Sequence, residues 1–299
     1  MTDWAASAAL SGARPGLDWA ADGADWPNRS ASRFVQAGGL SWHVQILGDG
    51  PPLLLLHGTG ASTHSWRALA PLLAERFTVV APDLPGHGFT QRPPHRGLTL
   101  PGVAAAVDAL MGALRMAPDA IVGHSAGAAI AARMALDAPS RYRRLVSLNG
   151  AFLPFDGPAA VLFPAMAKAL FLNPFAPRLI SHMATRPGAV ERLIASTGSS
   201  IDEEGLELYR RLMSRSEHIA GVTAMMAKWD LVPLRRELGG LGERLALVVA
   251  RGDETVPPHV GYEIKALAPE ATLIQLDRLG HLAHEEAPER LAAVIDEAI

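Results

Sequence analysis

The chain contains 299 residues, a length that fits one α/β catalytic domain with an inserted segment. Apolar residues make up 49% of it and charged residues 19%, which excludes a globally disordered protein. The 27 basic and 30 acidic residues give a net charge of -3 without any long basic run, so nucleic acid is not expected as a partner.

The absence of cysteine and of long apolar segments excludes further classes of protein. The chain has no cysteine, so it cannot form a disulfide, a thiolate zinc site or an iron–sulfur cluster. Residues 1–10 lack a basic start and a sustained apolar block, and no apolar stretch is long enough to span a bilayer. We therefore expect a cytoplasmic protein with no transmembrane segment, and contact with a membrane surface stays open.

Residues 1–30 form a distinct N-terminal arm in the sequence. They are rich in Ala, Gly, Asp and Pro and show no periodicity, yet Trp4, Trp19 and Trp26 are three of the six tryptophans in the chain. A fully solvated tail rarely carries so many large apolar rings. We interpret the arm as a segment whose rings pack on the domain; docking on a partner is the alternative.

From residue 33 onward the pattern predicts a doubly wound, mostly parallel sheet. Apolar and polar residues alternate in 34–36 and 40–46 on either side of Gly38-Gly39, which predicts an antiparallel hairpin. Short apolar runs then alternate with segments of helical spacing. The further strands are expected at 53–56, 77–81, 120–122, 145–148, 245–249 and 272–276. The helices are expected at 65–74, 103–114, 126–136, 261–268 and 288–298.

Residues 150–229 interrupt this alternation. They contain several prolines and helix-like runs at 165–172 and 206–213, and the part up to Pro177 is strongly apolar. We expect a helical cap over an apolar pocket; a helix pair packed on the sheet is the alternative. The predicted division is an arm at 1–30, a doubly wound α/β core at 31–149 and 230–299, and a cap at 150–229.

The candidate nucleophile is Ser125, in the sequence Gly123-His-Ser-Ala-Gly127. A strand is expected before it and a helix after it, which is the context of a nucleophile elbow. The sharp turn presents the serine Oγ above the sheet, and small residues at Gly123 and Gly127 avoid collision with neighbouring backbone. An ordinary glycine-rich turn between a strand and a helix is the structural alternative.

A serine nucleophile needs a general base. In folds with this type of nucleophile elbow the catalytic residues follow one another along the chain as serine, acid and histidine, so the base must be a late histidine. His259, His281 and His284 are the candidates. His281 is favoured because a short turn after the last strand brings it to the carboxyl edge of the sheet, where ligands bind in such folds. His284 is expected on the surface and His259 at the rim.

The candidate acid is Asp253, which follows the strand at 245–249 and so reaches the same edge. Its neighbour Glu254 is the reserve choice. In the other known arrangement the acid follows the preceding strand, but Asn149 occupies that position.

The oxyanion hole needs two backbone N–H groups that converge on one point. We expect them from Ala126 and from Thr59, in the loop after the strand at 53–56. His57 in that loop is interpreted as a packing and hydrogen-bonding residue. Asp83 and its glycines are expected to fix a turn, His124 to be structural or at the rim, and His87 is a weaker candidate for substrate contact. The sequence contains no metal-ligand spacing and no phosphate-binding loop, so no cofactor is expected.

These motifs together resemble the α/β-hydrolase superfamily across residues 33–299. They are His57-Gly-Thr-Gly60, Asp83-Leu-Pro-Gly-His-Gly88, the Ser125 pentapeptide, Gly252-Asp-Glu-Thr-Val-Pro257 and Gly280-His281. A closer resemblance is to the magnesium-chelatase accessory proteins of bacteriochlorophyll biosynthesis in phototrophic bacteria. It rests on Asp25-Trp-Pro27, Ser32-Arg-Phe-Val35, and the segments 38–45, 53–66 and 123–129. This resemblance implies a role in the insertion of magnesium into protoporphyrin, with an undefined reaction.

The residues favour a serine hydrolase that acts on an ester or similar acyl substrate with an apolar portion. Serine at the elbow argues against dehalogenase or epoxide-hydrolase chemistry, which uses a carboxylate nucleophile. The alternative is an accessory protein that binds a tetrapyrrole or magnesium-chelatase subunits with an unused triad. Lyase or perhydrolase use of the same triad is the third reading.

Overall fold

The computed structural model describes residues 16–154, 170 and 172–299. Its centre is an eight-stranded sheet with the order β1-β2-β4-β3-β5-β6-β7-β8. The hairpin β1 (Ser32–Ala37) and β2 (Leu40–Leu47) is antiparallel, as predicted, and β2 pairs antiparallel with β4. The other strands run parallel: β3 (Pro52–Leu56), β4 (Thr78–Pro82), β5 (Ala120–His124), β6 (Arg144–Leu148), β7 (Leu245–Ala250) and β8 (Thr272–Leu276). The predicted α/β-hydrolase fold class is confirmed.

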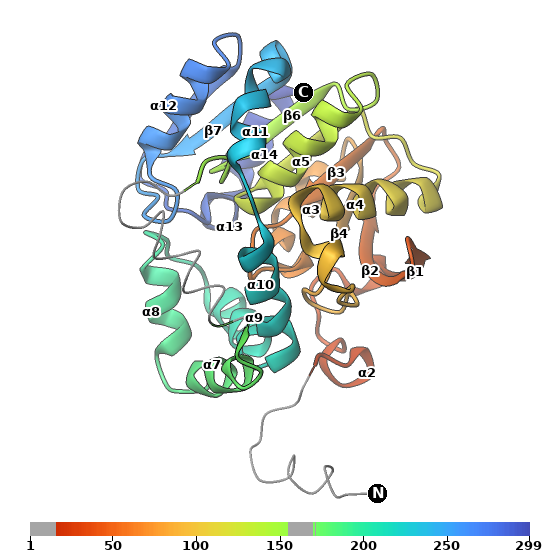
Figure 1. Ribbon diagram of the computed structural model, residues 1–299, viewed down its shortest axis with the longest axis vertical. Coiled ribbons are helices and arrows are strands. Elements are labelled where there is room, and N and C mark those ends of the chain that lie inside the picture. The colour runs from red at the N-terminus through yellow and green to blue at the C-terminus, as the bar shows by residue number, and fades with distance from the viewer. Residues whose placement is uncertain (1–15, 155–169, 171) are drawn as a thin grey trace, which may run out of the picture.

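Helices cover both faces of the sheet (Figure 1). One face packs on α4 (Leu100–Leu114), α5 (Ala126–Asp137) and α12 (Pro258–Leu267), and the other on α3 (Leu69–Leu73) and α14 (Pro288–Ala298). Successive strand residues point to opposite faces, so Leu54 and Leu56 enter the first core while Leu53 and Leu55 enter the second. This is why the strand at 53–56 is a continuous apolar run.

The helix expected at 65–74 is wrong in its extent. The structure has a 3₁₀ turn, η2 (Thr63–Trp66), followed by the short helix α3. A continuous helix would place Pro71 in its interior, where the ring lacks an N–H and collides with the carbonyl of Arg67. In α3, Pro71 instead lies in the first turn, where no intrahelical N–H bond is lost.

Between β6 and β7 the described residues form helices. They are α7 (Ala176–Ala184), α8 (Ala189–Ala195), α9 (Glu203–Met213), α10 (Ser216–Lys228), α11 (Val232–Glu237) and the 3₁₀ segment η4 (Leu238–Arg244). The helix expected at 206–213 lies within α9, whereas the one expected at 165–172 falls almost entirely outside the described residues. In Figure 1, α7 to α10 gather at one end of the molecule. None of the described helices is long and apolar enough to cross a membrane.

The described part of the N-terminal segment packs on the protein. After the short helix α2 (Trp19–Asp22) and before the turn η1 (Arg29–Ala31), Trp26 is buried and its Nε1 donates to Thr63 Oγ1 at 3.1 Å. The Trp26 ring contacts Phe89 and the apolar face of α9. This favours the packing interpretation for the arm; Trp4 lies outside the described residues.

Candidate active site

Ser125 lies at the junction of β5 and α5, in a strained backbone conformation. Its φ of 51° and ψ of -116° are rare for a residue with a side chain. An added Cβ at Gly123 would lie 2.5 Å from the backbone N of Ala128, and one at Gly127 would lie 2.0 Å from the carbonyl oxygen of Leu56. The turn therefore requires glycine on both sides of the serine.

His281 and Asp253 meet at the same edge of the sheet, from the loops after β8 and β7. His281 Nδ1 donates to Asp253 Oδ2 at 2.7 Å, and both side chains are buried. The other carboxylate oxygen, Oδ1, accepts the backbone N–H groups of Thr255 and Val256, each at 2.8 Å. With Nδ1 protonated, His281 Nε2 is left with a free lone pair, as a general base requires.

The hydroxyl of Ser125 is not hydrogen-bonded to the candidate base His281 in this structure. No hydrogen bond joins Ser125 Oγ to the His281 ring within the described part of the chain. The link between the two loops is made next to the serine: His124 Nε2 donates to the His281 carbonyl at 2.9 Å, and the rings of His124 and His281 lie 4.7 Å apart. Catalytic hydrogen bonds commonly tighten only when substrate is bound.

Asn149 connects the loop that carries His281 to the end of β7. It follows β6 with φ at 48°, and its Nδ2 donates to the carbonyls of Gly280 and His281, at 3.1 and 2.9 Å. Its Oδ1 accepts the N–H of Ala250, at the end of β7, at 2.8 Å. One buried amide thus holds the histidine loop against the strand that leads to Asp253. In the sequence, Asn149 stood out only because it occupies the alternative position of the triad acid. Its place after β6, at the same edge of the sheet as Asp253 and His281, could have indicated this role.

Asn149→Asp is expected to lower kcat by on the order of 100-fold, because a carboxylate would face two carbonyl oxygens and displace His281. The substitution preserves size and tolerance of a positive φ. Stopped-flow or steady-state ester kinetics, read beside a thermal melt, separate this effect from simple instability. Asn28→Asp is the matched control, since Asn28 also has a positive φ but bonds the Arg67 carbonyl. An unchanged kcat in a folded Asn149→Asp variant would show that Asn149 does not position His281.

The loop of residues 57–60 passes beside the nucleophile, as the expected oxyanion hole requires. An added Cβ on Gly58 would lie 3.1 Å from Ser125 Cβ. His57 fixes this loop: its Nδ1 donates to the Gly58 carbonyl at 2.8 Å, and its Nε2 accepts the N–H of Leu84 at 2.8 Å. His218 of α10 donates from Nε2 to the Gly60 carbonyl at 3.1 Å. His57 is therefore the packing residue that the sequence indicated.

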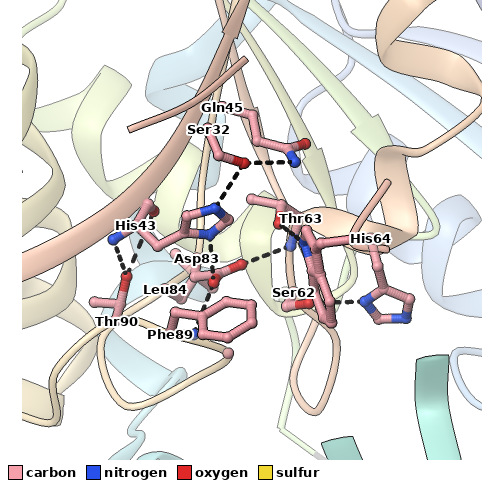
Figure 2. A network of polar contacts seen from close by, with 12 residues as sticks. Ser32, His43, Gln45, Ser62, Thr63, His64, Asp83, Leu84, Phe89 and Thr90 are labelled. Atoms are coloured by element: carbon pink, nitrogen blue, oxygen red, sulfur yellow. Dashed lines mark hydrogen bonds and ion pairs between the residues drawn. The ribbon is translucent and has the colours of Figure 1, made fainter. Parts of the chain in front are cut away.

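Asp83 holds the neighbouring turn (Figure 2). Its Oδ1 accepts the N–H of Thr63 at 2.7 Å, while its Oδ2 accepts the N–H of Phe89 at 2.9 Å and Nδ1 of His43 at 2.8 Å. Burial favours the neutral acid, but His43 and these N–H groups outweigh it and hold the pKa of Asp83 well below its ordinary value. On the far side, His43 Nε2 lies 3.0 Å from Ser32 Oγ. The aspartate shapes the turn, as expected.

The expectation that His284 lies on the surface is wrong. The ring is buried, its Nε2 lies 2.8 Å from Ser65 Oγ, and it contacts the His124 ring with centroids 4.4 Å apart. The reason is a buried polar network that draws the short helix α13 (Ala283–Glu286) inward: Ser65 also donates to Glu285 Oε1 at 2.6 Å, and Glu285 pairs with Arg67. A buried charge is kept only with such partners.

The other candidate residues from the sequence differ from His281 and Asp253 in their exposure and contacts. His259 on α12 and Glu254 are exposed, whereas His281 and Asp253 are buried and hydrogen-bonded to each other. His87 is buried beneath the rings of His57 and His218, and its Nε2 has no partner among the described residues. No group of three or more His, Cys, Asp or Glu side chains in the described ranges is placed to hold a metal ion.

The buried neutral histidines make the free energy of unfolding depend on pH in the acidic range. Burial lowers the pKa of His218 to about 4 and that of His284 to about 3, from an ordinary 6.5. At pH values between the lowered pKa of each histidine and 6.5, the unfolded chain binds more protons than the folded one. The free energy of unfolding must therefore fall as the pH drops below 6.5. Each such histidine contributes a slope of about 1.4 kcal/mol per pH unit.

Urea unfolding measured across this window tests the point. His284→Gln can still donate to Ser65, and we expect it to flatten the acid slope by the share of one histidine, about 1.4 kcal/mol per pH unit. Wild-type stability that is constant from neutral pH to pH 4.5, on the order of two units of acidification, would contradict the burial of neutral histidines.

Comparisons with known proteins cover most of the chain. A family model described as alpha/beta hydrolase fold matches residues 51–288. The magnesium-chelatase 30 kDa subunit of Rhodobacter capsulatus is 40% identical over 274 residues, which cover 91% of this chain and 95% of that protein. An uncharacterized hydrolase of Bacillus subtilis is 26% identical over 83% of this chain and 89% of its own length. The solved structure of the epoxide hydrolase CorEH has a TM-score of 0.73 at 23% identity, covering 89% of this chain and 97% of that one.

Proposed function

Because the chain belongs to the α/β-hydrolase family, and within it to the group of the magnesium-chelatase 30 kDa subunit, we propose that it is a serine hydrolase with Ser125, His281 and Asp253 as its catalytic triad. The observation that carries this proposal is the buried 2.7 Å bond from His281 Nδ1 to Asp253 Oδ2, at the sheet edge that also carries the strained Ser125. A serine, a base and an orienting acid on three separate loops are what acyl transfer needs.

The mechanism assigns one task to each group. Ser125 Oγ attacks the carbonyl carbon of the substrate while its proton passes to His281 Nε2, and Asp253 stabilises the imidazolium that forms. His281 then gives the proton to the leaving oxygen, which departs from the acyl-enzyme. Water then attacks the acyl carbon and loses a proton to His281. As the bond between the acyl carbon and Ser125 Oγ breaks, His281 returns this proton to Oγ and the carboxylic acid is released.

The negative oxygen of the tetrahedral intermediate is assigned to the amides of Thr59 and Ala126. Ala126 is the first residue of α5, where N–H groups are free and the helix dipole is positive. Thr59 lies in the loop that His57 and His218 hold beside Ser125. Each such donor supplies about 3 kcal/mol of transition-state stabilisation.

The substrate class follows from the nucleophile and the insertion. A serine forms an acyl-enzyme and favours an ester or similar acyl compound, whereas breaking an epoxide or carbon–halogen bond in this fold uses a carboxylate. The apolar segment before Pro177 favours a substrate with an apolar portion, under a cap formed by residues 150–229.

A series of p-nitrophenyl esters with short, long and bulky aryl acyl groups tests this assignment. We expect turnover well above solvent hydrolysis and a strong dependence of kcat/KM on the acyl group, because a capped pocket selects shape. Equal rates for all esters would argue against the cap, and no turnover of any ester would argue against the hydrolase.

A second candidate function is favoured by the 40% identity to a protein named as a magnesium-chelatase subunit. In this reading the protein assists magnesium chelation in bacteriochlorophyll biosynthesis by binding a tetrapyrrole or chelatase subunits. The Ser125→Ala variant separates the two: if it assists a reconstituted chelatase as well as wild type does, the accessory role does not use the triad. Loss of assistance in this variant would tie the pathway role to hydrolysis.

A further inference from the structure

A row of large apolar side chains is exposed along α7. Phe175, Leu179 and Met183 recur every four residues on one face, and Leu172 precedes them. Their exposed fractions lie between 47% and 69%. We refer to these four side chains as the α7 row. Scattered exposed apolar residues are normal, but four on one short stretch mark an interaction surface.

The other side of α7 is packed within the molecule. Ala176 is buried, and the helix contacts α9 and α10. Figure 1 places α7 at the outer end of the helical group, away from α12 and the strands. The α7 row is thus carried on a helix that packs through its other face, and the row itself is exposed in the described part of the structure.

The sequence that carries the row holds charges of one sign, although Arg186 also borders a surface pocket with Glu191 and Glu207. The sequence contains no aspartate or glutamate between residues 157 and 190, while it places Arg178 and Arg186 there. Both arginines are exposed, and neither forms an ion pair with a described residue. In a chain with a net charge of -3, this is a cationic exception around an apolar row.

We propose that the α7 row is a contact surface for a lipid bilayer with anionic headgroups. Aromatic and aliphatic side chains beside cations are the composition of helices that lie in the membrane interface. Anionic headgroups match Arg178 and Arg186, and the acyl boundary takes up Phe175 and Leu179. A protein partner would need an acidic and apolar surface of matching shape, whereas a bilayer offers both properties without any matching shape.

The test is sedimentation of the full chain with vesicles of phosphatidylcholine alone and of phosphatidylcholine mixed with phosphatidylglycerol. We expect the mixed vesicles to bind wild type at least about tenfold more strongly, and added salt to reduce this difference. Phe175→Glu with Leu179→Glu should lower binding by at least about tenfold, because two exposed apolar groups become anionic. Arg178→Ser with Arg186→Ser should lower it by on the order of tenfold.

Matched variants on other helices control for general effects. Tyr262→Glu on α12 and Arg236→Ser on α11 change exposed residues of the same kinds, and these variants should bind as wild type does. The proposal is overturned if wild type sediments with neither vesicle, or if the α7 variants bind as well as these controls. It is also overturned if no vesicle binding occurs and the α7 variants instead abolish a dimer seen by light scattering.

Discussion

Replacing Ser125 with alanine is expected to lower kcat for ester hydrolysis by on the order of 10⁵-fold, because no other hydroxyl can form the acyl-enzyme. KM should change little, since the substitution removes one oxygen and leaves the acyl pocket intact. The strained turn already carries a Cβ, so the thermal midpoint should stay close to that of wild type. Initial rates with the best p-nitrophenyl ester give the result directly.

Ser181→Ala is the matched control for this experiment. Its hydroxyl is also buried but donates only to the Arg178 carbonyl within α7, so its loss should leave kcat unchanged. A fall of less than about tenfold in Ser125→Ala would mean that the ester is cleaved by another group.

Asp253→Asn is expected to lower kcat by on the order of 10⁴-fold, the cost known for losing the orienting acid of a serine triad. Two backbone N–H groups, from Thr255 and Val256, point at Oδ1 and will select the amide oxygen for that position. The amide NH₂ then faces His281 Nδ1 and forces the proton onto Nε2. In that tautomer the imidazole cannot accept the proton of Ser125.

Glu254→Gln is the natural control, because Glu254 is the adjacent acid and is exposed. We expect it to retain wild-type kcat. Equal losses in the two variants would mean that the acid is not assigned to one side chain, and a loss only in Glu254→Gln would move the role to that residue. Kinetics and a thermal melt of each variant are sufficient for this comparison.

The positions of the strands and the nucleophile turn could be predicted because their signals are local. A run such as 53–56 is short, apolar and bounded by turn residues, which is typical of a strand buried on both faces. The glycines around Ser125 are required by contacts within the same turn. The placement of His281 beside Asp253 also follows from local order, because both loops must leave parallel strands at the same edge.

What could not be predicted depends on partners far away in the sequence. His284 is buried because Ser65 and Glu285 bond each other, a contact between residues 220 positions apart. Asn149 gains its role from carbonyls in a loop that the sequence pattern cannot place to within a hydrogen bond. The division of the helix expected at 65–74 does have a local signal, because Pro71 would lie in the interior of that helix.

If Ser125 is an activated nucleophile, it must react covalently with a fluorophosphonate. Such probes form a covalent bond with a serine only when a base removes its proton. After digestion, mass spectrometry should find the adduct on Ser125 of wild type, no adduct at this site in Ser125→Ala, and much slower labelling in His281→Ala. Folded wild-type protein that is not labelled, or is labelled at another serine, would contradict the assignment.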